Sequence, residues 1–163
     1  MSTDGVAHRF VRGGVSVDLV APDGVGQRAD LTTVAGGVTV EVGGGTFALQ
    51  RYRPVAVRTG ERTGEIPLPD LAGAILIKAV AATHDRKRGP ERHLRDLAFL
   101  LSLVVDPFQI RDTLAPRNCR RVTAVDPLGD SDHEAWMLID DPRARAEGQA
   151  TFRFLWGGPD SSD

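Results

Sequence analysis

Apolar and polar positions follow two different periods along this chain. Up to about residue 60, short runs rich in β-branched residues alternate with glycines, a pattern typical of strands joined by tight turns. We therefore predict strands over residues 15–21, 38–42 and 47–58. The glycine runs Gly36-Gly37 and Gly43-Gly44-Gly45 are interpreted as hairpin turns between them.

Beyond Pro67-Leu68-Pro69 the spacing changes to that of helices. Asp70 is placed to cap a helix over residues 71–83, which contains no proline. A second helix is predicted over 91–105, because its apolar residues recur three and four positions apart. Shorter helices are predicted over 108–114, 117–125, 132–140 and 144–155.

These elements predict an α+β fold, with a small, mostly antiparallel sheet followed by a helical bundle. The 163 residues suit one domain over residues 1–156, with strands at about 8–60 and helices at about 70–156. The glycine- and aspartate-rich tail, 157–163, is predicted to be disordered.

Composition narrows the classes of partner and compartment. A net charge of -2 gives no overall attraction to DNA, and no apolar stretch reaches the ~20 residues of a membrane helix. The single cysteine, Cys119, excludes an internal disulfide framework and favours a reducing compartment. We therefore expect a cytoplasmic protein without a membrane or DNA partner.

Asp18 is the first candidate for chemistry. In the first strand Val15, Val17 and Leu19 share one face, so Asp18 points to the opposite face. Aspartate is disfavoured inside strands, and this one requires either water or a cationic partner. A solvated sheet face and a cation site both remain open.

Lys78 is the sole charged residue between Asp70 and Asp85, on a helix otherwise rich in alanine and isoleucine. Its ammonium group must reach the solvent or meet an anion. Three interpretations follow: an ordinary surface position, an anion-binding residue, or an ion pair with Asp85 about two turns further along the helix.

Asp96 is the third candidate, on the predicted helix over residues 91–105. It lies four residues after Arg92, so the local interpretation is a helix-surface ion pair. Familiar hydrolase and phosphate-loop motifs are absent from the sequence: the glycine runs lack a following Lys-Ser or Lys-Thr, the four histidines show no zinc-ligand spacing, and no Gly-x-Ser-x-Gly occurs.

Five short segments in order carry a family resemblance. They are His8-Arg9-Phe10, Val17-Asp18-Leu19-Val20-Ala21-Pro22-Asp23-Gly24, Ile66-Pro67-Leu68-Pro69, Leu76-Ile77-Lys78-Ala79 and His93-Leu94-Arg95-Asp96-Leu97. Together they resemble the nucleotidyltransferase-like AbiEii/AbiGii toxin family over roughly residues 9–105. The resemblance implies a nucleotidyltransferase-type sheet backed by a helical domain, in a protein related to toxin–antitoxin or phage-defence toxins.

The same resemblance implies roles for the three candidates. Asp18 takes the place of a catalytic carboxylate that helps to hold Mg²⁺, Lys78 that of the phosphate-contacting lysine, and Asp96 that of a supporting acidic residue on the next helix. The family's Gly-Ser loop and Asp-x-Asp pair precede the strand of Asp18, and residues 1–7 contain neither. The chain thus resembles an N-terminally incomplete nucleotidyltransferase fold.

Two functions follow as expectations. With the missing motifs supplied upstream, the protein would transfer a nucleotide from a nucleoside triphosphate to an RNA or protein acceptor and be held in check by a cognate antitoxin. This chain by itself is expected to be inactive, because a lone aspartate binds Mg²⁺ poorly. The alternative is a binding or partner module that keeps the fold without catalysis.

Overall fold

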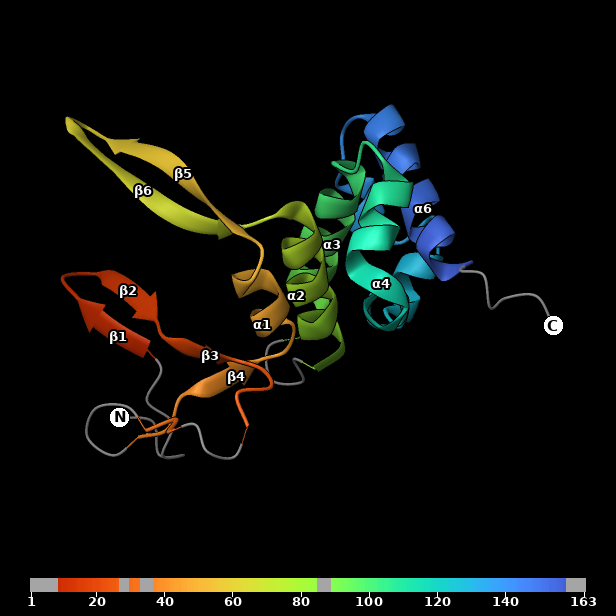
Figure 1. Cartoon of the computed structure of the whole chain (residues 1–163). Coiled ribbons are helices and arrows are strands. Elements are labelled where there is room, and N and C mark those ends of the chain that lie inside the picture. The colour runs from red at the N-terminus through yellow and green to blue at the C-terminus, as the bar shows by residue number, and fades with distance from the viewer. Residues whose placement is uncertain (1–8, 27–29, 33–36, 85–88, 158–163) are drawn as a thin grey trace.

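Strands occupy one side of the molecule and helices the other (Figure 1). The computed structural model describes residues 9–26, 30–32, 37–84 and 89–157. The strands are β1 (Arg9–Arg12), β2 (Val15–Asp18), β3 (Val20–Pro22), β4 (Val40–Val42), β5 (Tyr52–Thr59) and β6 (Arg62–Pro69). The helices are α1 (Gly45–Leu49), α2 (Leu71–His84), α3 (Glu91–Ser102), α4 (Pro107–Thr123), α5 (Glu134–Met137) and α6 (Pro142–Trp156), with a 3-10 turn, η2 (Asp126–Gly129).

The predicted α+β class is confirmed, but the prediction of a single sheet is wrong. The described strands form three separate two-stranded sheets, of which β1–β2 and β5–β6 are antiparallel and β3–β4 is parallel. In each antiparallel pair, a two-residue turn joins the two strands into a hairpin. Gly13 and Gly14 have φ of 54° and 81°, and Gly60 has φ of 58°, the left-handed values that such turns require.

The segment after the second glycine run also differs from its prediction. Residues 47–49 were expected to begin a strand, but they belong to the helix α1, and the glycines before them lead into that helix. A strand begins only at Tyr52. A local pattern of apolar residues after glycines does not distinguish a short buried helix from a strand.

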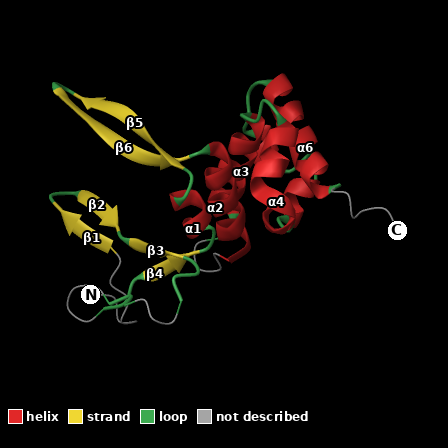
Figure 2. Cartoon of the chain, viewed as in Figure 1, coloured by secondary structure: helices red, strands yellow, loops and turns green. Residues whose placement is uncertain are grey.

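Helices α2, α3, α4 and α6 pack together around the main core, as Figure 2 shows. Trp136 on α5 belongs to this core and is fully buried, and its indole N–H donates to the carbonyl of Leu128 at 3.1 Å. Gly148 lets α6 approach α3 closely, because a Cβ there would lie 3.0 Å from both the Trp136 ring and the backbone of Ser102. The bundle is therefore close-packed where these helices meet.

The predicted helices are present, but most of them begin or end at other residues than predicted; α3, for example, ends at Ser102. Asp70 caps α2 by accepting a hydrogen bond from the N–H of Gly73 at 2.8 Å, and Val104 is buried beside the α3 face. The two helices expected over 108–114 and 117–125 form α4, which is broken at Ala115 (φ 57°, ψ 162°) just before Pro116. Proline disfavours helical geometry in the residue before it.

Of the predicted disordered tail, residues 158–163 lie outside the described part of the chain. Within that described part, no helix is both long enough and apolar enough to cross a membrane.

Candidate functional site

The structure brings two of the three predicted residues together. Lys78 on α2 donates to Asp96 on α3, with 2.5 Å between Nζ and Oδ2. The two side chains are 34% and 50% exposed, so the pair lies at the surface where the helices meet. This contact accounts for the lysine on an otherwise apolar helix. The alternative partner Asp85 lies outside the described residues.

Asp18 lies at the end of β2, directly opposite Arg9 on β1. The guanidinium of Arg9 donates to both carboxylate oxygens, from Nε at 2.7 Å and from Nη2 at 2.6 Å. This hydrogen bond and the carboxylate charge raise the pKa of Arg9 above its ordinary value. The carboxylate that the resemblance assigns to Mg²⁺ is therefore engaged by a protein cation on both oxygens.

The three candidates do not form one site. Asp18 belongs to the β1–β2 hairpin, which stands apart from α2 and α3 in Figure 1. Among the described residues, no group of three or more His, Cys, Asp or Glu side chains could hold a metal ion. A Mg²⁺ site needs carboxylates free to face the ion, and Asp18, bound to Arg9, does not fit that requirement.

Asp23 has a positioning role that the sequence did not reveal. Its Oδ2 accepts from the N–H of Gly44 at 2.7 Å, and its Oδ1 accepts from the N–H of Thr46 at 3.1 Å. The hydroxyl of Thr46 also donates to the carbonyl of Asp23. One aspartate after β3 thus holds the glycine loop and the start of α1, with partners 21 and 23 residues away.

Asp23 also ties this region to the helical part. Its carboxylate lies 3.5 Å from Nη2 of Arg121 on α4. Burial raises the pKa of Asp23, but the N–H groups of Gly44 and Thr46 and the charge of Arg121 together outweigh that effect, and the pKa falls below its ordinary value. The loop packs closely here: a Cβ at Gly43 would lie 2.4 Å from the side chain of Val80.

Cys119 is a core residue of α4 rather than a reactive thiol. Its side chain is buried, and its Sγ lies 3.7 Å from the carbonyl oxygen of Arg111. Burial raises the pKa of the thiol, so little thiolate forms at neutral pH.

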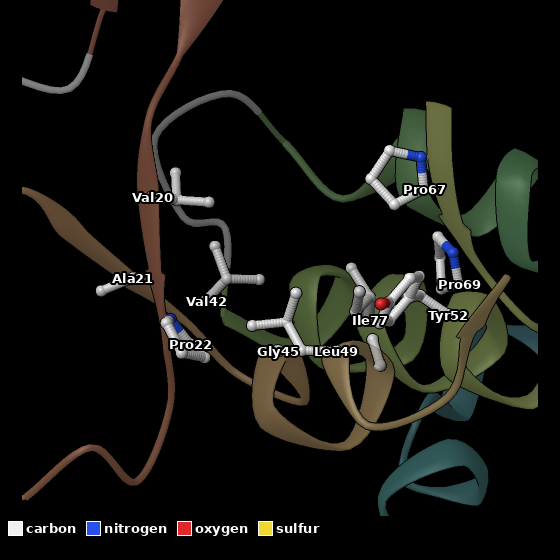
Figure 3. Close-up of a pocket in the computed structure, with 11 residues that line it drawn as sticks. Val20, Ala21, Pro22, Val42, Gly45, Leu49, Tyr52, Pro67, Pro69 and Ile77 are labelled. Carbon is white, nitrogen blue, oxygen red and sulfur yellow. The ribbon is translucent and has the colours of Figure 1, made fainter. Parts of the chain in front are cut away.

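A mostly apolar cavity of about 440 Å³ is lined by β3–β4, α1, the base of β5–β6 and one residue of α2 (Figure 3). Its walls are Val20, Ala21, Pro22, Val42, Gly45, Ala48, Leu49, Tyr52, Pro67, Pro69 and Ile77. Tyr52 brings a phenolic hydroxyl into this lining. Since none of the lining residues is ionisable at neutral pH, the cavity suits apolar groups rather than a triphosphate.

Comparisons with protein-family models, with curated proteins and with solved structures found no match to this chain.

Proposed function

We propose that this chain is a nucleotidyltransferase-like module that acts by binding a partner protein and does not itself transfer nucleotides. The observation that carries the proposal is the double hydrogen bond from Arg9 to the carboxylate of Asp18. A guanidinium on both oxygens leaves this aspartate unsuited to the metal-binding role that the resemblance implies.

The relationship to toxin–antitoxin and phage-defence toxins remains part of the proposal. It is supported by the ordered segments that resemble the AbiEii/AbiGii family and by the α+β architecture in which they lie. The partner in such a pair is a cognate antitoxin or a comparable protein. The single buried Cys119 agrees with a cytoplasmic setting.

Nucleotide transfer and metal binding test the proposal directly. The chain is incubated with Mg²⁺ and each radiolabelled nucleoside triphosphate, with total RNA or with protein as acceptor, and Mg²⁺ binding is measured by titration calorimetry. We expect neither incorporation nor binding heat. Transfer by this chain, abolished in Asp18→Ala, would refute the proposal.

The variant Arg9→Gln is the matched control for the ion pair. It removes the guanidinium while leaving Asp18 in place, and one free carboxylate still binds Mg²⁺ poorly. We expect no gain of Mg²⁺ binding in Arg9→Gln. A gain that is lost again in the double variant with Asp18→Ala would identify a metal site held closed by Arg9.

A second candidate function is nucleotide transfer by a longer product that supplies the Gly-Ser loop and the Asp-x-Asp pair. The contact between Lys78 and Asp96 favours it, because the resemblance assigns both residues to the active site. In such a product Asp18→Ala should abolish transfer and Lys78→Ala should weaken the use of nucleotide. Full activity of either variant would exclude the corresponding role.

A further inference from the structure

The β5–β6 hairpin presents two chemically different faces. Side chains alternate along each strand, so the residues on the face away from the cavity are fixed by the strand register. They are Arg53, Val55, Val57 and Thr59 from β5, with Arg62, Gly64, Ile66 and Leu68 from β6. We call these eight residues the aliphatic face. The opposite face carries Tyr52, Pro67 and Pro69, which line the cavity.

The aliphatic face has no complete cover in the described part of the chain. Ile66 and Leu68 are 47% and 44% exposed, and the hairpin projects away from the helices in Figure 1. Val55 and Val57 are half-buried, but a Cβ built on Gly64 would meet nothing within 4 Å, so the face is open at Gly64. A two-stranded hairpin gains stability when its apolar side chains are covered.

The charges on this face are of one sign. Arg53 lies near the base of the hairpin and Arg62 at its tip, and none of the eight residues is acidic. Neither guanidinium forms an ion pair with any residue in the described part of the chain. By contrast Arg51, just before β5, is paired with Asp70 at 2.8 Å. The aliphatic face thus has at each end an arginine without an ion-pair partner among the described residues.

Proline residues make strand addition at the hairpin edges unfavourable. Pro54 and Pro67 face each other in the register, so their pair is one of those that exchange no main-chain hydrogen bonds. In such pairs main-chain N–H groups point outward to the edge, and proline has none. Pro69 removes another outward donor two residues along β6. A partner is therefore favoured to pack on a face of this hairpin rather than extend its sheet.

We propose that the aliphatic face docks an amphipathic helix of a partner protein, with apolar residues along one side and carboxylates at both ends. From Arg53 to Thr59 the face extends over six residue steps, roughly 20 Å at about 3.4 Å per residue. A helix of about 13 residues covers that length. This proposal rests on the partner-binding function proposed above and identifies the surface and the chemistry of its partner.

The test begins with selection of a random 16-residue peptide library against the full chain. We expect enriched peptides with apolar residues at helical spacing and with Asp or Glu at both ends of the apolar side. Enrichment of peptides with strand-like alternation, of basic peptides, or of no family at all would overturn the proposal.

The selected peptide is then synthesised and its affinity measured by fluorescence anisotropy. Reversing both charges in Arg53→Glu/Arg62→Glu should weaken binding on the order of ten-fold or more, because both ends of the helix then meet like charge. Arg58→Glu is the matched control: it lies on the same hairpin but on the opposite face, and it should leave affinity unchanged. Circular dichroism checks that both variants remain folded.

Ile66→Thr tests the aliphatic contact without adding charge and should also weaken binding. The proposal would be overturned if Arg58→Glu lost as much affinity for the peptide as the other variants. It would also be overturned if neither the double charge reversal nor Ile66→Thr lost affinity. So would competition of the peptide by single-stranded RNA, or a dimer of the chain that Ile66→Thr dissociates. If the peptide tests fail and the chain still transfers no nucleotide, the proposed partner-binding function stands and only the aliphatic face is excluded as its binding surface.

Discussion

Large side chains of the helical part form a shared buried core, whereas no side chain of the described strands is buried. Trp136 is 0% exposed on α5, which packs against α3 and α6, while Val17 on β2 is 53% exposed. The helices are held by a shared core. The β1–β2 hairpin is held by its turn and by the contact between Arg9 and Asp18, and the loop before α1 is held by Asp23. Exposed apolar side chains also occur in the helical part, as at Phe108 and Leu138, but those of the strand-rich part have no buried core of strand residues beneath them.

The largest expected difference between the two parts concerns their apolar side chains. Trp136→Ala removes a fully buried ring and should lower the free energy of unfolding by about 3–5 kcal/mol. Val17→Ala should change it by less than about 0.5 kcal/mol, since the side chain is half exposed. Urea unfolding followed by circular dichroism measures both. Similar losses from the two variants would contradict the contrast.

Asp23 joins the two parts through its contact with Arg121. Its replacement should lower the free energy of unfolding by less than Trp136→Ala and by more than Val17→Ala. Asp23→Ala leaves the N–H groups of Gly44 and Thr46 without their acceptor and Arg121 without its carboxylate. We expect the free energy of unfolding to fall by about 1–3 kcal/mol. Hydrogen exchange should rise at Gly44 and Thr46 and stay unchanged at Trp136. Unchanged exchange at the glycine loop would show that Val80 packing alone holds it.

The contribution of Asp23 should also depend on pH. Folding lowers its pKa, so its stabilising effect is complete above the ordinary aspartate value of about 3.9 and is lost as the pH falls through the lower folded value. Asp23→Asn should therefore be less stable than the wild type at pH 7. That difference should narrow below about pH 4. A difference that stays constant down to pH 2 would contradict this assignment.

The smallest expected effect concerns Lys78 and Asp96. A double-mutant cycle with Lys78→Met and Asp96→Asn should give a coupling of less than about 1 kcal/mol, because both side chains are substantially exposed. The coupling should decrease as salt is added. A larger, salt-independent coupling would show that this pair is more than a surface link between α2 and α3.

The sequence was informative where a local signal determined the structure. Asp70 followed by a proline-free apolar run predicted the start of α2, and the spacing of Leu94, Leu97 and Leu101 predicted the buried face of α3. Capping and helical periodicity act over a few residues, so one segment contains the whole pattern.

The sequence was not informative where contacting residues lie far apart along the chain. Residues 47–49 form a helix because Asp23 binds the preceding loop and Val80 packs against Gly43, and neither contact is visible in the local pattern. The partner of Lys78 is 18 residues away on another helix, and that of Asp18 is across a turn. Which charges pair depends on the fold that brings those elements together.

The positions of Tyr52 and the tryptophans give each part of the molecule its own optical signal. The chain has one tyrosine and two tryptophans. Tyr52 lines the cavity beside the hairpins, and Trp136 and Trp156 belong to the helical part. Tryptophan fluorescence therefore reports on the helical bundle, and tyrosine fluorescence reports on the strand-rich part. Unfolding of either part can thus be observed in the unlabelled protein.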